Sequence, residues 1–271
     1  MKVIYRISDK SYIKPKLPGV TKEFCLDNCL SALGKIDIVI ADNCNESTIE
    51  MLKRKNLEIM ETSLGNAGSF GLALNFAVST LIADNNETIY FVEDDYIHKK
   101  CKNLLDEGLT FSDYVTLYDH PDKYTNMYDN GEVCKVRFYK NQHWRSSVST
   151  TMTFAAKLKT LKEDCSIFFD ICKNKFHPDD HTIFQELHNK KKRNLYVSIP
   201  GHCIHADIRT NILYDEDNEL DYWVVDLLEK HLKKQIKEEH LFFLERIPSY
   251  ESLSGLKKLL LLNQVITNIS E

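Results

Sequence analysis

The stretch from Thr88 to Asp95 reads TIYFVEDD, and it decides the fold class. Its first five residues form a continuous apolar, β-rich run, which is typical of a strand covered on both faces. Three acids follow at once: Glu93, Asp94 and Asp95. In α/β proteins ligands bind at the carboxyl ends of parallel strands, so this stretch predicts a ligand site at such an edge.

The pattern before this stretch alternates short apolar runs with helical ones. It predicts strands over residues 2–7, 37–41 and 57–61, and helices over 22–33, 46–54 and 69–83. Such alternation implies βαβ units and a mostly parallel sheet. We therefore expect an α/β fold with a Rossmann-like central sheet, flanking helices and polar strand ends that converge on one crevice.

The pattern after Asp95 predicts a second, mixed half. We expect a helix over 98–109, strands over 114–118, 133–139, 145–154 and 195–199, and helices over 158–172 and 179–190. From about residue 220 the chain is helical and amphipathic. The expected division is a domain of residues 1–215, with halves 1–97 and 98–215, and a helical extension of residues 216–271.

The composition excludes several classes of protein. The chain has 271 residues and a formal net charge of −5, which argues against a nucleic-acid partner. No apolar run approaches the roughly 18 residues of a membrane span, and the N-terminus does not resemble a signal peptide. The eight cysteines form no CxxC pair, which favours reduced thiols in a cytoplasm.

The acids of Glu93–Asp95 are the first candidate for chemistry. Clustered carboxylates after a buried strand repel one another, and a bound Mn²⁺ or Mg²⁺ would remove that cost. Such a metal uses one or two protein carboxylates and fills its shell with phosphate oxygens and water. The alternative is a solvated acidic turn that caps a following helix.

Two helix starts are further candidates. The stretch GNAGSFG at residues 65–71 could bring backbone N–H groups to a phosphate or ribose, or could be only a flexible turn. Asp179 and Asp180, after Pro178, stand where one carboxylate caps a helix and another could act as a general base. We expect Asp179 to be the cap, and the helix dipole to keep Asp180 ionised.

Trp144, beside His143 and Arg145, could stack on a sugar or pack in the protein. His205 could be a metal ligand or a hydrogen-bonded histidine. A zinc site is also conceivable, but its spacings match no established finger; its residues would be Cys172, His177, His181, Cys203 and His205.

Together, in this order, these motifs over residues 1–210 resemble the GT-A glycosyltransferases, particularly the family 2-like enzymes of bacteria and large viruses. The resemblance implies a nucleotide-sugar donor, UDP-linked by default, and a glycan or other hydroxyl acceptor. Ile7, Ser8 and Asp42 would line the nucleoside pocket. Gly68 and Ser69 would lie near the ribose or diphosphate, and Asp94 near the ribose or sugar. Asp95 and His205 would bind Mn²⁺ or Mg²⁺, and Asp180 would be the catalytic base. Trp144 and Arg145 would lie on the acceptor side.

The sequence departs from the family pattern in having EDD instead of a strict DXD, and its extension has no counterpart. Transfer by single displacement would invert the anomeric carbon. Two rivals stay open: a nucleotidyltransferase of related fold, which usually has a Gly-rich loop with a basic residue after the first strand, and a non-catalytic interaction module. Here that position reads Ser8-Asp9-Lys10-Ser11.

The extension has its own pattern. Apolar residues recur at helical spacing, namely Val225, Leu228, Leu232, Ile236 and Phe243, and an apolar stretch follows at 256–262. This surface must be covered, by packing back on the catalytic domain, by a homodimer through residues 220–271, or by a membrane surface.

Overall fold

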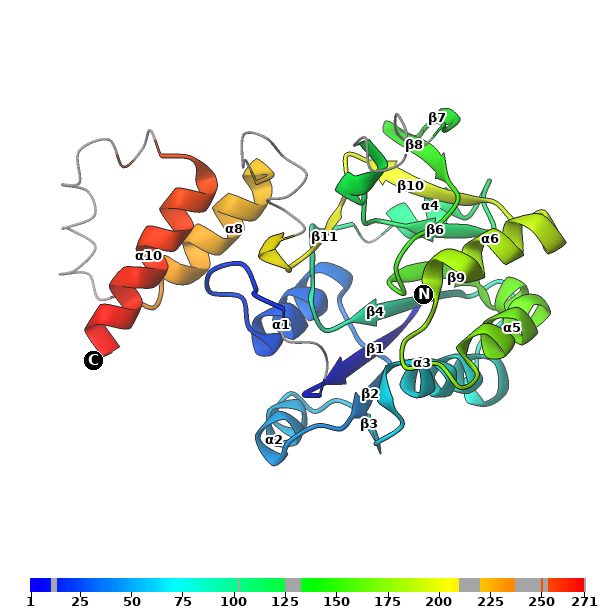
Figure 1. Ribbon diagram of the computed structural model, residues 1–271, viewed down its shortest axis with the longest axis horizontal. Coiled ribbons are helices and arrows are strands. Elements are labelled where there is room, and N and C mark those ends of the chain that lie inside the picture. Colours follow the sequence, from blue (N-terminus) through cyan, green and yellow to red (C-terminus); the bar gives the residue numbers. More distant parts are fainter. Residues whose placement is uncertain are drawn as a thin grey trace. The chain divides into compact units, whose positions relative to one another are not determined.

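The opening strands form the parallel half of a sheet in a computed structural model that describes residues 1–10, 14–101, 103–124, 133–209, 220–236, 250 and 253–270. The central strand, β1, runs parallel to β2 on one side and to β4 on the other, and β3 runs parallel to β2 (Figure 1). The bounds are β1 (Lys2–Ser8), β2 (Ile38–Asp42), β3 (Ile59–Thr62) and β4 (Thr88–Glu93).

The other half of the sheet is mixed. From β4 the strand order continues through β9, β6, β10, β8 and β7; β10 is parallel to β6, and the other neighbours are antiparallel. The bounds are β6 (Tyr114–Thr116), β7 (Val136–Tyr139), β8 (Gln142–Ser147), β9 (Phe154–Lys157) and β10 (Leu195–Ile199). The expected α/β fold of the GT-A type, with a Rossmann-like parallel half, is confirmed.

Helices cover both faces of this sheet, and each face has its own hydrophobic core. The first core lies under α1 (Lys22–Leu33), α2 (Glu46–Arg54) and α4 (Leu104–Gly108). The second lies under α3 (Gly65–Asn75), the π-helix η1 (Phe76–Thr80), α5 (Leu158–Cys172) and α6 (Asp180–Lys191). Burial on both faces explains why the strands read as unbroken apolar runs.

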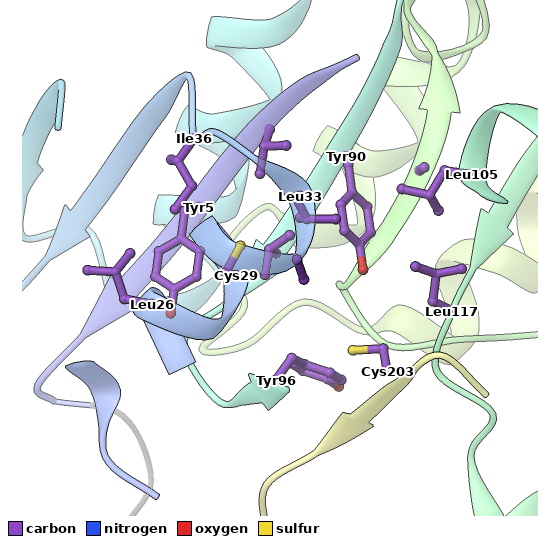
Figure 2. Close-up of a cluster of buried hydrophobic side chains, with 14 of the residues drawn as sticks. Tyr5, Leu26, Cys29, Leu33, Ile36, Tyr90, Tyr96, Leu105, Leu117 and Cys203 are labelled. Carbon is purple, nitrogen blue, oxygen red and sulfur yellow. The ribbon is translucent and has the colours of Figure 1, made fainter. Parts of the chain in front are cut away.

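Figure 2 shows the first core. Tyr5 of β1 and Tyr90 of β4 lie beside Leu26, Cys29 and Leu33 of α1, and all five side chains are buried. The eight cysteines are free thiols. Burial raises the pKa of Cys101 to about 12, so this thiol stays protonated at neutral pH.

Two expected elements differ in the structure. The helix expected over 98–109 begins only at Leu104, because residues 96–98 form β5 (Tyr96–His98) and the Asn28 side chain bonds the backbone of His98 on both sides. The single strand expected over 145–154 is two strands, β8 and β9. They separate where the Ser147 hydroxyl donates to the Ser149 carbonyl at 2.8 Å and closes a turn.

The chain divides into two compact units, one of residues 1–13 and 22–204, the other of residues 14–21 and 205–271. The second unit thus begins eleven residues before the expected boundary and includes a segment from the start of the chain. The reason is backbone pairing: Leu17 N donates to Ala206 O, and Ile208 N to Pro15 O, both at 2.9 Å.

In the second unit, α8 (Tyr222–Lys233) packs against α10 (Gly255–Ser270). A Cβ at Gly255 would clash with Val225, so the helices approach closely there. Most of the apolar residues expected to need cover are buried, namely Val225, Leu228, Leu232, Ile236, Leu256, Leu259 and Leu262, whereas Leu260 is 49% exposed. Phe243 lies outside the described residues. Packing of α8 against α10 therefore covers much of this surface, and packing on the catalytic domain, the homodimer and membrane attachment stay predictions.

Candidate functional site

Polar side chains of three adjacent strands meet at the carboxyl edge of the parallel half. Ser8, which ends β1, is in register with Asp42, which ends β2. On the other side of β1, Arg6 is in register with Glu93 at the end of β4. The Ile7 side chain is buried in the first core, so Ile7 could line a nucleoside pocket only with its backbone.

Asp42 anchors the start of α3. Its Oδ1 accepts hydrogen bonds from Leu64 N at 2.7 Å and Gly65 N at 3.1 Å, and its Oδ2 accepts one from Asn43 Nδ2 at 2.9 Å. Gly65 has φ +76°, a conformation that glycine adopts at little cost. Asp42 therefore holds the turn between β3 and α3, at the position expected to line the nucleoside pocket.

The first turn of α3 is bonded to the protein itself. Besides the two N–H groups that Asp42 binds, Ala67 N donates to Phe176 O at 3.3 Å, which ties the loop before α6 to this helix. An anion at this helix start would compete with these bonds. The structure thus gives the glycine-rich turn a bracing role where the sequence suggested phosphate binding.

Gly68 and Ser69 are needed for packing. A Cβ at Gly68 would lie 2.7 Å from Leu64 Cβ, so the close approach of Leu64 requires a glycine there. Ser69 is buried, and its hydroxyl donates to Asn66 O at 3.1 Å. Neither residue therefore presents a side chain to a donor, and their expected place near the ribose or diphosphate stays a prediction.

Arg6 is a buried cation at the centre of this edge. Its NH2 donates to Asn66 O at 2.9 Å, to Asn66 Oδ1 at 2.5 Å and to Ser69 Oγ at 3.3 Å, and its NH1 lies 3.6 Å from Glu93 Oε1. Burial lowers the pKa of the guanidinium, and the charge of Glu93 opposes that shift. Arg6 therefore joins the ends of β1 and β4 to α3.

Lys22, at the start of α1, supplies a second cation. Its Nζ lies 3.0 Å from Asp94 Oδ2 and 3.3 Å from Asp9 Oδ1, and it donates to the Ser8 carbonyl. Ser8 N also donates to Asp94 Oδ2 at 3.1 Å. Burial raises the pKa of Asp94, the Lys22 charge opposes this, and the charge of Asp95 adds to it. Asp94 is thus bound to the protein on two sides.

The three acids therefore have different surroundings, which bears on a metal. All three acids are half-buried; Glu93 pairs with Arg6 and Asp94 with Lys22, and Asp95 lies at the turn after β4. Across the part of the chain that the structure describes, no group of three or more His, Cys, Asp or Glu side chains could hold a metal. The donor set fits an ion held by Asp95 and completed by phosphate oxygens and water, and it does not fit a structural zinc site.

His205 opens the second unit, and the relative position of the two units is not determined. Its side chain is buried, with Nε2 3.5 Å from Lys14 Nζ. Its expected role as a metal ligand stays a prediction.

The start of α6 separates the two neighbouring aspartates as expected. Asp179 is the N-cap residue, and its Oδ1 accepts a hydrogen bond from Thr182 N at 3.1 Å. Asp180 Oδ1 accepts one from His181 N at 2.8 Å. Burial raises the pKa of Asp180 above its ordinary value, although that backbone bond opposes the shift. The expectation that the helix dipole keeps Asp180 ionised stays a prediction.

A short segment joins this helix start to the acids of β4. Ser149 Oγ lies 3.2 Å from His181 Nδ1, and Thr153 Oγ1 accepts a hydrogen bond from Glu93 N at 3.2 Å. The segment from Ser149 to Thr153 therefore links the start of α6 to the end of β4. That Asp180 and the Glu93–Asp95 acids serve one site stays a prediction.

The expected stacking of a sugar on Trp144 is wrong. Its side chain is fully buried in the first core and packs edge-on against Phe111, with ring centroids 5.7 Å apart. Arg145, one residue later, points to the other face of β8 because side chains alternate along a strand. It is buried too, and pairs with Asp119 at 2.6 Å.

Sequence reasoning missed Arg6, Lys22 and the pair of Asp119 with Arg145. Arg6 left a signal, because an arginine inside the buried run KVIYRIS needs a polar partner. Lys22 and Asp119 left none, since lysines and aspartates at loops and helix starts are common on any surface.

No protein-family model matches the chain, and no curated protein matches it. Similar solved structures include residues 1–349 of TarS from S. aureus, at 14% identity, covering 89% of this chain and 68% of that one, with a TM-score of 0.42. A nucleoside-diphosphate-sugar pyrophosphorylase from Vibrio cholerae RC9 is 11% identical over 76% and 95%, with a TM-score of 0.46. An inositol-1-phosphate CTP transferase from T. maritima is 14% identical over 83% and 93%, with a TM-score of 0.44.

Among the described residues, no helix combines the length and apolar character that crossing a membrane requires.

Proposed function

We propose that the chain is a metal-dependent glycosyltransferase, which moves a sugar from a nucleotide-sugar to an acceptor hydroxyl. One observation carries this proposal: the segment from Ser149 to Thr153 joins the Glu93–Asp95 acids at the end of β4 to the start of α6, where Asp180 is half-buried. The motif order that resembles the family 2-like GT-A enzymes supports the same reaction, with a UDP-sugar as the default donor.

The donor would lie at the ends of β1, β2 and β4. Ser8 and Asp94 form one hydrogen-bonded unit there, which Lys22 holds in place. Asp95 is the residue that would hold Mn²⁺ or Mg²⁺. When bound, such an ion neutralises the charge that develops on the leaving diphosphate.

Asp180 would act on the acceptor side. As the acceptor oxygen forms its bond to the anomeric carbon, the Asp180 carboxylate takes the proton of that hydroxyl. The bond from the anomeric carbon to the diphosphate breaks, and its electron pair leaves with the phosphate oxygen. A pKa raised by burial makes Asp180 a better proton acceptor than an exposed aspartate. Attack opposite the leaving group inverts the anomeric configuration.

Lys22 favours one alternative, a nucleotidyltransferase. Those enzymes usually have a Gly-rich loop with a basic residue directly after the first strand, and the corresponding position here, Ser8-Asp9-Lys10-Ser11, has no glycine. Although Lys22 starts a helix further along the chain, its Nζ donates to the carbonyl of Ser8, the last residue of that strand. A nucleotidyltransferase would form a nucleotide-sugar and release pyrophosphate, whereas a glycosyltransferase releases a nucleoside diphosphate.

The test compares these products directly. We expect a panel of UDP-sugars with Mn²⁺ to give slow release of UDP, and sugar phosphates with nucleoside triphosphates to give no pyrophosphate. Asp95→Asn should remove most of the UDP release while thermal unfolding stays unchanged. Asp170→Asn, at an exposed site on α5, is the matched control and should keep full activity.

Three results would contradict the proposal. Full activity in excess EDTA would exclude the metal, and pyrophosphate formation would favour the nucleotidyltransferase. A chain that neither hydrolyses nor binds any nucleotide-sugar would favour a non-catalytic interaction module.

A further inference from the structure

The edge of the mixed half carries an exposed apolar face. In the antiparallel pair β7–β8, Val136 lies opposite Arg145 and Phe138 opposite His143, so these side chains share one face of the hairpin. Val136 is 63% exposed and Phe138 61% exposed, and the rings of Phe138 and His143 lie 4.9 Å apart. Trp144 lies on the opposite face of the hairpin, where it is buried in the core. Val136 and Phe138 are therefore exposed although the hairpin packs well on its other face.

Tyr124 adds a ring whose position is fixed. Its hydroxyl donates to Asp119 Oδ2 at 2.5 Å, and the Arg145 guanidinium lies over the ring, 5.3 Å from its centroid. The residue is nevertheless 59% exposed. These two interactions offset the conformational entropy that is lost when an exposed ring is held in one orientation, so the ring is preorganised to bind a ligand.

This ring is connected to the site that contains the base. Lys123, the neighbour of Tyr124, is buried and donates from Nζ to Ser149 Oγ at 2.9 Å. Ser149 in turn contacts the ring of His181, which follows Asp180. The side chains of Lys123, Ser149 and His181 therefore connect Tyr124 to the helix start that carries Asp180, the carboxylate that would deprotonate an acceptor.

From these contacts we propose that Tyr124, Val136, Phe138 and His143 form an aromatic platform that binds a neutral saccharide acceptor; this inference rests on the proposed function. A sugar ring has an apolar C–H face that stacks on an aromatic ring, and hydroxyl edges that the platform leaves in solvent. The charges beneath the platform, Arg145 and Asp119, neutralise each other at 2.6 Å, so they do not select a charged ligand.

The test uses three probes, maltotetraose, cellotetraose and tetra-N-acetylchitotetraose, with binding followed by ligand-detected NMR. We expect at least one to bind, and Tyr124→Ala and Phe138→Ala each to weaken it about tenfold. Tyr124→Phe keeps the ring and should retain most of the affinity. Tyr222→Ala removes a more exposed tyrosine, on α8, and should change nothing. Thermal unfolding of each variant checks the fold.

The outcomes separate the two proposals. Release of UDP from UDP-sugars is measured on the wild-type chain without acceptor, because this reaction reports the proposed function alone. If UDP is released but no probe binds, or Tyr124→Ala binds as the wild type does, the platform is overturned and the proposed function stands. If sedimentation shows a dimer that Phe138→Ala dissociates, the face is an interface between copies, and the saccharide proposal is likewise overturned. If no UDP is released, the proposed function itself fails.

Discussion

The parallel and mixed halves of the sheet use their polar residues differently. In the parallel half, Asp42, Arg6 and Lys22 at the strand ends bond to the backbone or to one another, so the residues of the proposed donor edge also hold the fold together. In the mixed half, the Asp180 carboxylate accepts a hydrogen bond from the N–H of its own neighbour, His181, and Tyr124 is more than half exposed.

This difference has a consequence for mutagenesis. A substitution at the donor edge removes both a bracing contact and a site contact, so stability and activity should fall together. A substitution on the acceptor side should separate them, because Asp180 and Tyr124 contribute little to packing. The following predictions test that contrast, from the largest effect to the smallest.

Arg6→Ala should have the largest effect on stability. It removes three hydrogen bonds and leaves Glu93 without its buried partner, which costs about 3–5 kcal/mol in similar cases. Denaturant unfolding measures the loss in the free energy of unfolding. The matched control is Lys190→Ala, which breaks an exposed ion pair with Glu186 and should change that free energy by less than about 0.5 kcal/mol. If the two substitutions lowered the free energy of unfolding equally, the role of Arg6 in stabilising the fold would be contradicted.

Asp180→Asn should instead act on turnover. We expect kcat to fall at least about a hundredfold, the usual worth of a general base, with donor affinity nearly unchanged. Steady-state kinetics with varied donor separates kcat from KM. A product with the anomeric configuration of the donor would show retention and would contradict the role of Asp180 as base.

The pH dependence of the same residue gives a second measurement. The base must be ionised, so kcat should decline as the pH falls through the raised pKa of Asp180, at a higher pH than for an ordinary aspartate. The pH dependence of stability has the opposite sign to that of kcat. A carboxyl with a raised pKa in the folded state contributes stability below its unfolded pKa, and this is lost as the pH rises through the folded pKa. Asp180→Asn should therefore not lower the free energy of unfolding at pH 7, and a clear loss there would contradict the separation of roles.

Asp179→Ala should have the smallest effect. It removes the N-cap bond to Thr182 N and should lower the free energy of unfolding by about 1 kcal/mol, with turnover nearly unchanged. Thermal unfolding and kinetics on the same sample check both values. A loss of turnover as large as that of Asp180→Asn would mean that the two aspartates cannot be assigned separate roles.

The sequence determined the parallel half and its polar edge. Unbroken apolar runs such as DIVIA and TIYFV can be stable only if both faces are covered, and helices of ten or more residues between them require parallel pairing. The cap at Asp179 was also readable, because N-capping is a local interaction within one turn of helix.

Only the tertiary structure decided which polar groups meet. The partners of Arg6 lie 60 or more residues away, and those of Lys22 include Asp94, 72 residues away, so no local pattern could pair them. The same holds for the edge hairpin. Strand alternation separates Trp144 from Arg145, but only the packing of β8 decides that the tryptophan enters the core and that Arg145 meets Tyr124 instead. Local periodicity sets what each residue prefers, whereas burial and pairing across the sheet set what it touches.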